Sequence, residues 1–273
     1  MTEKYIHGSS RSERQRLALM NELINDRCLD ALGLGDEKLV VDVGSGTGQF
    51  TRLMAAQLSA SALVIGVEQN PDQVEAALQL TEEDAEGGMV DFRISDAKHI
   101  PLDEKEIGRV DLAHARFLLE HVADPAEVVR DMVAVVRPGG RIVLADDDHE
   151  LMRFWPEPPG LDAAWRAYYR SYRQLGNDPL VGRKLASLLR QAGATPSFIT
   201  QVFYGACAGT DSFPGVVDNL IWVLKGARST VLAAGEIAAR DYDAALDSFR
   251  AFRELPDAAL WYVINWAEGR VPE

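Results

Sequence analysis

Short apolar runs alternate with amphipathic segments along the first 147 residues. The runs that favour strands lie at 38–43, 62–68, 89–95, 109–115 and 141–147. The segments whose apolar positions recur at helical spacing lie at 9–32, 47–59, 71–85 and 124–136. Because strands that alternate with helices form βαβ units, this pattern predicts a parallel sheet covered by helices on both faces.

The pattern changes after residue 147. Prolines and aromatic residues crowd the segment 148–178, among them Trp165, Tyr168 and Tyr172. Farther along, the sequence predicts a helix at 182–194, a strand at 197–208, mostly helix at 212–254 and a last strand at 259–267. We interpret the two irregular regions, 148–178 and 212–254, as a cap built onto the sheet.

Composition narrows the function classes. The net charge of −14 and the pI of about 4.8 oppose binding to a phosphate backbone, so we expect no nucleic-acid partner. No apolar run approaches the roughly 20 residues of a membrane span, and the first 15 residues lack an apolar signal segment, so we expect no membrane partner. Two distant cysteines, Cys28 and Cys207, argue against a disulfide framework and favour a cytoplasmic location.

A glycine-rich turn follows the first predicted strand. The stretch VVDVGSGTGQF places Gly44, Gly46 and Gly48 before a helix, where backbone N–H groups can meet a ligand. A dinucleotide-binding turn would carry its third glycine at Gln49, and a Walker loop would end in Gly-Lys followed by Ser or Thr. Neither pattern fits. Asp42 is placed to face the loop, where a carboxylate suits an ammonium group better than a pyrophosphate.

The chain resembles the class I S-adenosylmethionine (SAM)-dependent methyltransferases in five motifs that occur in order. VVDVGSGTGQF resembles the first motif, VIGVEQNP carries Glu68 at the end of the second strand, and SDAKHIPL follows the third strand. VDLAHARFLLEHVADP resembles the fourth-strand motif, and VVRPGGRIVLADDD the following turn and fifth strand. The nearest group is the small-molecule methyltransferases that resemble those of quinone biosynthesis.

The resemblance implies an α/β fold with a Rossmann-like, seven-stranded and mostly parallel sheet. Its last strand is antiparallel, helices cover both faces, and a helical cap is added. The parts we expect are an N-terminal helical lid at 1–35, a SAM-binding domain at 36–210 with an aromatic-rich insertion at about 148–178, a helical cap insertion at 211–256, and the final strand and C-terminus at 257–273.

The resemblance also implies SAM as the cofactor. Glu68 is expected to accept hydrogen bonds from the ribose hydroxyls and Asp96 from the adenine amino group, while the helix that follows Gly46 favours the carboxylate. The expected cofactor-binding residues are Asp42, Gly44, Ser45, Gly46, Thr47, Gly48, Glu68, Gln69, Asp96, Ala97 and Arg116. Two alternatives stay open: Asp42 serves only the loop backbone, and Arg116 pairs with a surface carboxylate.

The sequence says less about the substrate pocket and the catalytic residues than about the cofactor site. The expected substrate-pocket residues are Tyr5, Trp155, Tyr169 and Trp222. Position alone makes His7, His149 and Tyr169 candidates for a catalytic role, and we expect His121 to be a packing residue. The run DDDH at 146–149 suggests metal binding, but the end of the fourth strand, AHARF, offers no carboxylate, so we expect no metal.

The predicted function is SAM-dependent methyl transfer to a small, apolar or aromatic metabolite by in-line displacement. The leaving group is a neutral thioether, so a base is needed only where the acceptor must lose a proton. Three alternatives stay open: a nicotinamide-dependent oxidoreductase, a SAM-fold protein with another reaction such as decarboxylation or cyclisation, and a non-catalytic SAM-binding module. The acceptor atom (O, N or C) and a homodimer also stay open.

Overall fold

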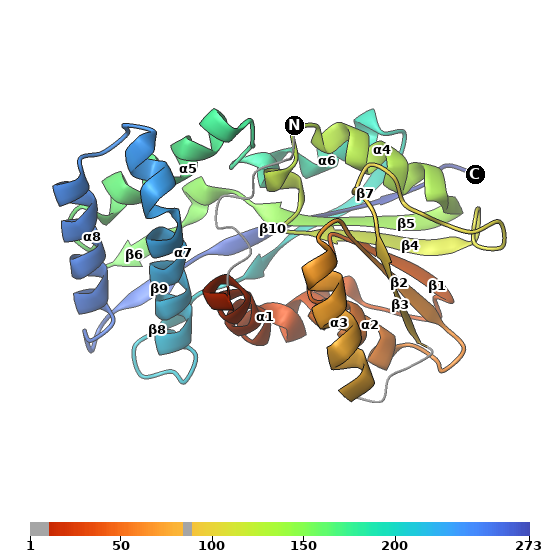
Figure 1. Ribbon diagram of the computed structural model, residues 1–273, viewed down its shortest axis with the longest axis horizontal. Coiled ribbons are helices and arrows are strands. Elements are labelled where there is room, and N and C mark those ends of the chain that lie inside the picture. The colour runs from red at the N-terminus through yellow and green to blue at the C-terminus, as the bar shows by residue number, and fades with distance from the viewer. Residues whose placement is uncertain (1–10, 84–88) are drawn as a thin grey trace.

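The computed structural model describes residues 11–83 and 89–273. Seven strands form one sheet in the order β3-β2-β1-β4-β5-β10-β7 (Figure 1). They are β1 (Leu39–Val43), β2 (Leu63–Glu68), β3 (Val90–Ile94), β4 (Val110–Arg116), β5 (Val136–Asp147), β7 (Thr195–Phe203) and β10 (Val263–Arg270). Strand β10 is antiparallel to β5 and β7, and the other pairs are parallel. The predicted fold class is confirmed.

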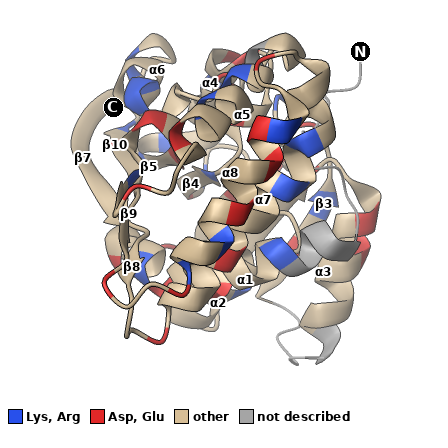
Figure 2. Ribbon diagram, turned by 90° about the vertical axis from the view of Figure 1, so that its left-hand side faces the viewer, with Lys and Arg blue, Asp and Glu red and all other residues tan. Residues whose placement is uncertain are grey.

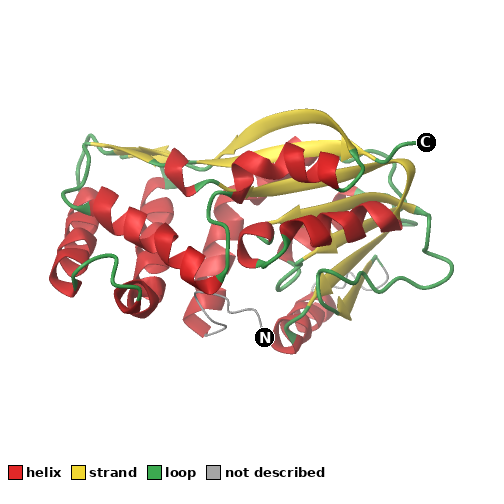
Figure 3. Ribbon diagram, turned by 90° about the horizontal axis from the view of Figure 1, so that it is seen from above, coloured by secondary structure: helices red, strands yellow, loops and turns green. Residues whose placement is uncertain are grey.

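Helices pack along the large sheet and gather in a cap at one end of the molecule (Figure 3). The α-helices of the described residues are α1 (Arg11–Leu32), α2 (Gln49–Gln57), α3 (Pro71–Glu83), α4 (Pro125–Val135), α5 (Leu161–Leu175), α6 (Leu185–Gln191), α7 (Phe213–Ala233) and α8 (Ala239–Phe252). Short 3-10 turns are η1 (Leu119–His121), η2 (His149–Leu151) and η3 (Val181–Lys184).

Strand β1 shows how the sequence builds the two faces of the sheet. All five of its residues are buried, as expected for a central parallel strand. Val40 packs into the core with α1, α2 and the cap helices, whereas Val41 and Val43 pack into the core with α4 and α6. Because successive side chains point to opposite faces, Asp42 shares the face of Val40, on the side of α1 and α2.

The segment RPGG forms part of β5, where the sequence predicts a turn ahead of the strand. Val110 pairs with Val136 and Leu112 with Arg141, so β5 accommodates the extra residues in a bulge. A Cβ on Gly140 would lie 2.5 Å from Val136 Cγ1, so this position requires glycine.

The last predicted strand is two strands. Tyr262 separates β9 (Ala259–Trp261) from β10, and β9 pairs with β6 (Arg153–Trp155) and β8 (Ala206–Cys207) in a three-stranded sheet. The sequence predicts neither this small sheet nor the break between β7 and β8. Both strands that flank β9 are short and come from segments far apart in the chain, so no local pattern reveals their pairing.

The cap consists of α5, α7, α8 and the small sheet, at the end of the molecule opposite α4 and β4 (Figure 1). Buried residues of these helices belong to the same apolar core as α1, α2 and the sheet, for example Tyr172, Leu224 and Phe249. The domain boundaries stay a prediction.

The described residues contain no helix of sufficient length and apolar character to cross a membrane. Acidic and basic residues are interspersed along the helices that face the viewer in Figure 2. The expectation of no nucleic-acid partner stays a prediction.

Candidate active site

A cavity of about 500 Å³ lies at the carboxyl ends of β1, β2 and β4, where ligands bind in open α/β sheets. We call it the glycine-loop cavity. Its lining residues are Leu17, Met20, Asn21, Asp42, Gly44, Ser45, Gly46, Thr47, Gln49, Phe50, Glu68, Gln69, Asn70, Gln73, His114, Arg116, Phe117, Leu118, His121 and Val122. The structure thus brings together eight of the eleven expected cofactor-binding residues.

The glycine loop turns back on itself against the end of β2. The N–H groups of Gly44 and Ser45 both donate to the Val67 carbonyl, at 2.8 and 3.1 Å. Gly46 has a φ of +58°, and a Cβ there would lie 3.2 Å from Gln73 Oε1 on the cavity wall. A side chain at Gly46 would therefore be strained and would narrow the space in which a ligand meets the backbone.

Gly48 serves packing and does not line the cavity. A Cβ on Gly48 would lie 2.3 Å from Phe92 Cζ, at a φ of +71°. The third glycine of the motif therefore lets α2 and the loop sit against β3. Its expected contact with the cofactor remains a prediction without geometric support.

Glu68 ends β2 with its carboxylate at the cavity wall. Oε1 accepts from the Asn70 N–H at 2.9 Å and Oε2 from the Gly46 N–H at 3.2 Å. Burial raises the pKa of this carboxyl, and the backbone donors oppose that rise. Each oxygen keeps a second lone pair, so the ionised carboxylate can still accept hydrogen bonds from a diol.

Asp42 is committed to neighbouring side chains. Its Oδ2 accepts from Thr51 Oγ1 at 2.6 Å, and Oδ1 lies 2.8 Å from His114 Nδ1. His114 on β4 is buried against Phe50 and Trp266, with ring centroids 5.0 and 6.2 Å away. Asp42 therefore anchors the start of α2 to β4, and any ligand contact would come in addition.

Arg116 ends β4 and points into the molecule, away from the surface carboxylates considered in the sequence analysis. One terminal nitrogen donates to Asn21 Oδ1 and Asn25 Oδ1 of α1, both at 2.8 Å. The guanidinium lies 4.1 Å from the ring centroid of Phe50. The other terminal nitrogen, Nη1, is buried without a hydrogen-bond partner among the described residues, as is Ser45 Oγ. Both atoms belong to residues that line the cavity, and unpaired polar atoms beside a cavity suit a polar ligand.

The remaining expected cofactor residues lie elsewhere. Asp96 is exposed and accepts from the Lys98 N–H at 3.0 Å, which makes it the first residue of a turn. Ala97 packs against the core on the α4 side of the sheet. Neither lines the cavity, and both roles stay predictions. Tyr5 and His7 lie outside the described residues.

A second, smaller cavity of about 90 Å³ adjoins the first, and we call it the aromatic cavity. Its lining residues are Arg16, Leu17, Met20, Phe117, Glu120, His121, Asp147, His149, Trp165, Tyr168, Tyr172, Tyr204, Asn219, Leu220, Val223, Tyr262 and Ile264. Leu17, Met20, Phe117 and His121 line both cavities. Phe117 has a φ of +53°, which is strained for a bulky residue, and such strain concentrates at functional sites.

Two of the expected substrate-pocket residues lie outside both cavities. Trp155 is 65% exposed because it points away from Phe154, which packs edge-on against Phe249 and Phe252 in the cap. Trp222 lies on the outer side of α7 and is 40% exposed. Neither lines the glycine-loop cavity or the aromatic cavity, and their role in the substrate pocket stays a prediction.

Helix α5 supplies the aromatic wall through other residues. Tyr169 is buried behind the His149 ring, stacked at 6.5 Å between centroids, and does not line the aromatic cavity. Trp165, Tyr168 and Tyr172 line it, because spacings of three, four and seven residues share one helical face. The crowding of aromatics in 148–178 indicated the segment, whereas only the helical phase identifies the residues.

The aromatic cavity brings together the ionisable residues Glu120, Asp147 and His149. Glu120 Oε2 lies 2.9 Å from His149 Nε2, and Tyr262 Oη lies 3.4 Å from His149 Nδ1. Burial raises the pKa of Glu120 above its usual range and that of Asp147 to about 7, while it lowers the pKa of His149. The sequence predicts no carboxylate at the end of the fourth strand, AHARF, and Glu120 lies one turn beyond that end, on η1.

His121 also lies here and lines both cavities. Its ring stacks on Tyr172 with centroids 5.9 Å apart, and Nε2 lies 3.3 Å from Glu120 Oε1. Burial lowers the pKa of His121 to about 3, so its imidazole is neutral. The expected packing role agrees with the stacking, but its position also places it between the two cavities.

Comparisons with known proteins agree with this geometry. Residues 41–144 match the family described as a methyltransferase domain. The chain is 30% identical over 188 residues to the O-methyltransferase cnsE of Penicillium expansum. The matching region covers 66% of this chain and 62% of that protein. The chain is 27% identical over 265 residues to the 27-O-demethylrifamycin SV methyltransferase of Amycolatopsis mediterranei, spanning 96% and 88%. Residues 41–144 thus form a methyltransferase domain similar to those of the class I SAM-dependent methyltransferases.

Solved structures of other proteins have the same fold as this chain. A protein of Bacillus halodurans matches it with a TM-score of 0.61 at 14% identity, over 91% of this chain and 99% of that one. Ubiquinone/menaquinone biosynthesis C-methyltransferases are also among its relatives. The chain spans about half to three fifths of the length of several curated relatives.

Proposed function

We propose that this methyltransferase binds SAM in the glycine-loop cavity and transfers the methyl group to a small, apolar or aromatic molecule in the aromatic cavity. The observation that carries the proposal is the shared wall of Leu17, Met20, Phe117 and His121. A donor in one cavity and an acceptor in the other would lie next to each other at these residues, and an in-line displacement requires that the side chains leave an opening through which the acceptor atom reaches the methyl carbon.

The glycine-loop cavity has the size and the polar atoms that SAM needs. Its volume of about 500 Å³ lies within the range of small-molecule sites, roughly 300–1,000 Å³. Glu68 offers two carboxylate oxygens to the ribose hydroxyls, and the unpaired Nη1 of Arg116 suits the carboxylate of the methionine part. When bound, SAM supplies a methyl group on a sulfonium sulfur whose departure leaves a neutral thioether.

The residues of the chain would accelerate methyl transfer by orienting the two reactants and excluding water more than by acid catalysis. Aligned reactants account for roughly 7–11 kcal/mol of a barrier, so positioning alone supports a large rate increase. Tyr168 and Tyr172 place ring faces and hydroxyls in the aromatic cavity, and their hydroxyls hydrogen-bond each other at 2.7 Å. The cavity admits the reacting end of an acceptor, and we propose that α1, which borders both cavities, moves to admit the rest.

Relatives support a small-molecule acceptor. One is an O-methyltransferase by name, and another is named for 27-O-demethylrifamycin SV. Both names describe transfer to oxygen, which we therefore propose as the acceptor atom. We also propose a cytoplasmic location, on the cysteine content noted above.

Calorimetry with SAM, S-adenosylhomocysteine (SAH) and NAD tests the cofactor. We expect SAM and SAH to bind at one site and NAD not to bind. Radiolabelled SAM incubated with a panel of hydroxylated aromatic compounds tests the transfer, and label recovered in an acceptor supports it. Failure of SAM and SAH to bind would overturn the proposal, and SAM binding without transfer to any acceptor would favour the non-catalytic alternative.

A further inference from the structure

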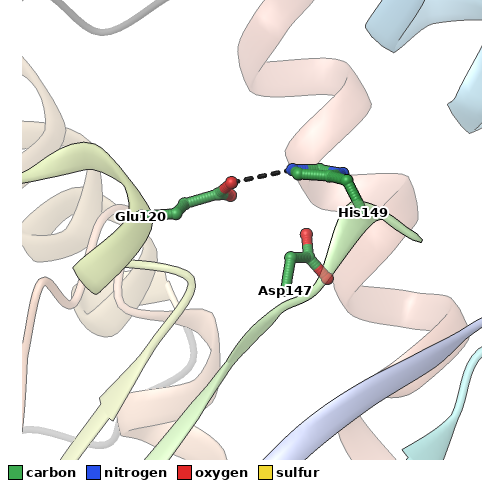
Figure 4. A group of neighbouring side chains, drawn as sticks. All are labelled: Glu120, Asp147 and His149. Carbon is green, nitrogen blue, oxygen red and sulfur yellow. Dashed lines mark hydrogen bonds and ion pairs between the residues drawn. The ribbon is translucent and has the colours of Figure 1, made fainter. Parts of the chain in front are cut away.

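Glu120, Asp147 and His149 come from three places and converge in the aromatic cavity (Figure 4). Glu120 lies on η1 beyond β4, Asp147 is the last residue of β5, and His149 begins η2. One ligand atom from each lies within 4.8 Å of the other two. Metal–ligand bonds of about 2.0–2.2 Å put two ligands of one ion roughly 3–4 Å apart, so small side-chain movements suffice to complete a site.

We propose that Glu120, Asp147 and His149 bind a divalent metal ion such as Mn²⁺ or Zn²⁺. Two carboxylates and one imidazole match ions of intermediate character, because imidazole suits transition metals and carboxylates suit harder ions. The three residues leave the remaining coordination positions to water or to an oxygen of the acceptor. Metal binding does not depend on the proposed methyl transfer, so either can fail alone.

An unsatisfied oxygen points to a ligand at this place. Asp147 Oδ1 is buried and has no hydrogen-bond partner within 3.5 Å in the described part of the chain. Burial raises the pKa of this carboxyl group, and the nearby Tyr262 hydroxyl lowers it. In Figure 4 the Asp147 carboxylate points toward the gap between Glu120 and His149. Buried polar atoms are almost always satisfied, so an orphan carboxylate oxygen beside two other potential ligands calls for a cation or an ordered donor.

The burial of the group also favours a bound cation. Glu120 and His149 are 4% exposed, and Asp147 is the last residue of β5 beside them. Arg16 lines the same cavity, where its Nη1 donates to Asn219 Oδ1 at 3.3 Å. Ionising a carboxyl group out of contact with water costs free energy unless a cation or hydrogen bonds compensate it, and a divalent ion would compensate both Glu120 and Asp147.

The surroundings hold the imidazole in a fixed orientation. Tyr262 Oη faces His149 Nδ1 at 3.4 Å, which leaves Nε2 on the side of Glu120. Trp165 Nε1 donates to the His149 carbonyl at 2.9 Å, and the Tyr169 ring lies parallel to the imidazole. Metal-binding histidines usually have such an outer partner on the second ring nitrogen.

The experiment is a titration of EDTA-treated full-length protein with MnCl₂, without SAM or acceptor. Binding is measured by calorimetry and by the electron paramagnetic resonance signal of free Mn²⁺. ZnCl₂ is titrated in parallel by calorimetry. We expect one ion per chain. Asp147→Asn and Glu120→Gln keep the side-chain shape and should each weaken binding at least tenfold.

Glu150→Gln is the matched control. Glu150 lies on the same turn as His149, but its carboxylate is half exposed and pairs with Arg183 at 2.7 Å. The circular dichroism spectrum and the melting temperature report folding of the variants, and neither depends on the proposed cofactor site.

Absence of saturable Mn²⁺ and Zn²⁺ binding to the wild-type protein would overturn the proposal. Unchanged metal affinity in Asp147→Asn and Glu120→Gln would overturn it as well. In both cases the Glu120–His149 pair is a direct hydrogen bond only.

Discussion

Replacing Glu68 by glutamine tests the cofactor site most directly. The amide keeps the shape of the carboxylate and one acceptor oxygen, but it loses the charge and one acceptor. The structure shows that Oε1 and Oε2 also receive the Asn70 and Gly46 N–H groups. Glu68→Ala would leave both donors unpaired and disturb the loop, so the glutamine variant separates binding from loop folding more cleanly.

The expected loss follows from the hydrogen bonds to the ribose. A hydrogen bond to a charged group contributes roughly 1.5–3 kcal/mol, and each 1.4 kcal/mol is a factor of ten in Kd. Losing one such bond should therefore weaken SAH binding by about ten- to a hundredfold. Calorimetry with SAH and with its 2′-deoxy analogue forms a double-mutant cycle, in which the two losses should not add.

Glu75→Gln is the control, because Glu75 is exposed on α3 nearby and should leave affinity unchanged. The wild-type affinity should also fall in acid. Burial raises the pKa of Glu68, so its ionised form, and SAH binding with it, should be lost as the pH falls toward this raised pKa, above 4.5. Unchanged affinity of Glu68→Gln for SAH at neutral pH would refute the placement of the ribose at Glu68.

Three further predictions concern the loop, the aromatic cavity and stability. Gly46→Val should abolish SAH binding in calorimetry and destabilise the fold by about 1–3 kcal/mol, because a β-branched residue is strained at a φ of +58°; normal binding would contradict the loop's role. Tyr172→Ala should lower kcat/KM at unchanged SAM affinity, whereas Trp155→Ala should change neither; the reverse result would restore Trp155 to the pocket. Arg93 lowers the pKa of Glu106, so Glu106→Gln should cost about 1–2 kcal/mol of unfolding free energy at neutral pH. That difference should vanish as the pH falls below 4.5 through the lowered pKa, and a difference that persists in strong acid would contradict the assignment.

The sequence predicts the large sheet well because each of its central strands is a continuous apolar run. Val40, Val41 and Val43 of β1 are all buried, so β-branched residues mark the strand regardless of which face each one covers. The acidic residue at the end of β2 and the glycine turn after β1 are likewise local features. Local sequence features therefore predict the large sheet and much of the glycine-loop cavity.

The cap depends on contacts that no local pattern contains. Trp155 and Trp165 are equally aromatic in the sequence, yet one faces solvent from β6 and the other lines the aromatic cavity from α5. The pairing of β6 and β8 with β9 joins segments that lie about 50 to 100 residues apart. Glu120 became visible as a cavity residue only when η1 placed it opposite His149.

The wall shared by the two cavities has a thermodynamic consequence. A ligand in the glycine-loop cavity fixes Leu17, Met20, Phe117 and His121, and an acceptor in the aromatic cavity meets the same side chains already ordered. Linkage then requires that SAH changes acceptor affinity by the same factor by which the acceptor changes SAH affinity. SAH that strengthens acceptor binding in this way would hold the next acceptor in a complex that cannot react. Turnover should therefore fall with accumulated SAH by more than competition with SAM alone predicts.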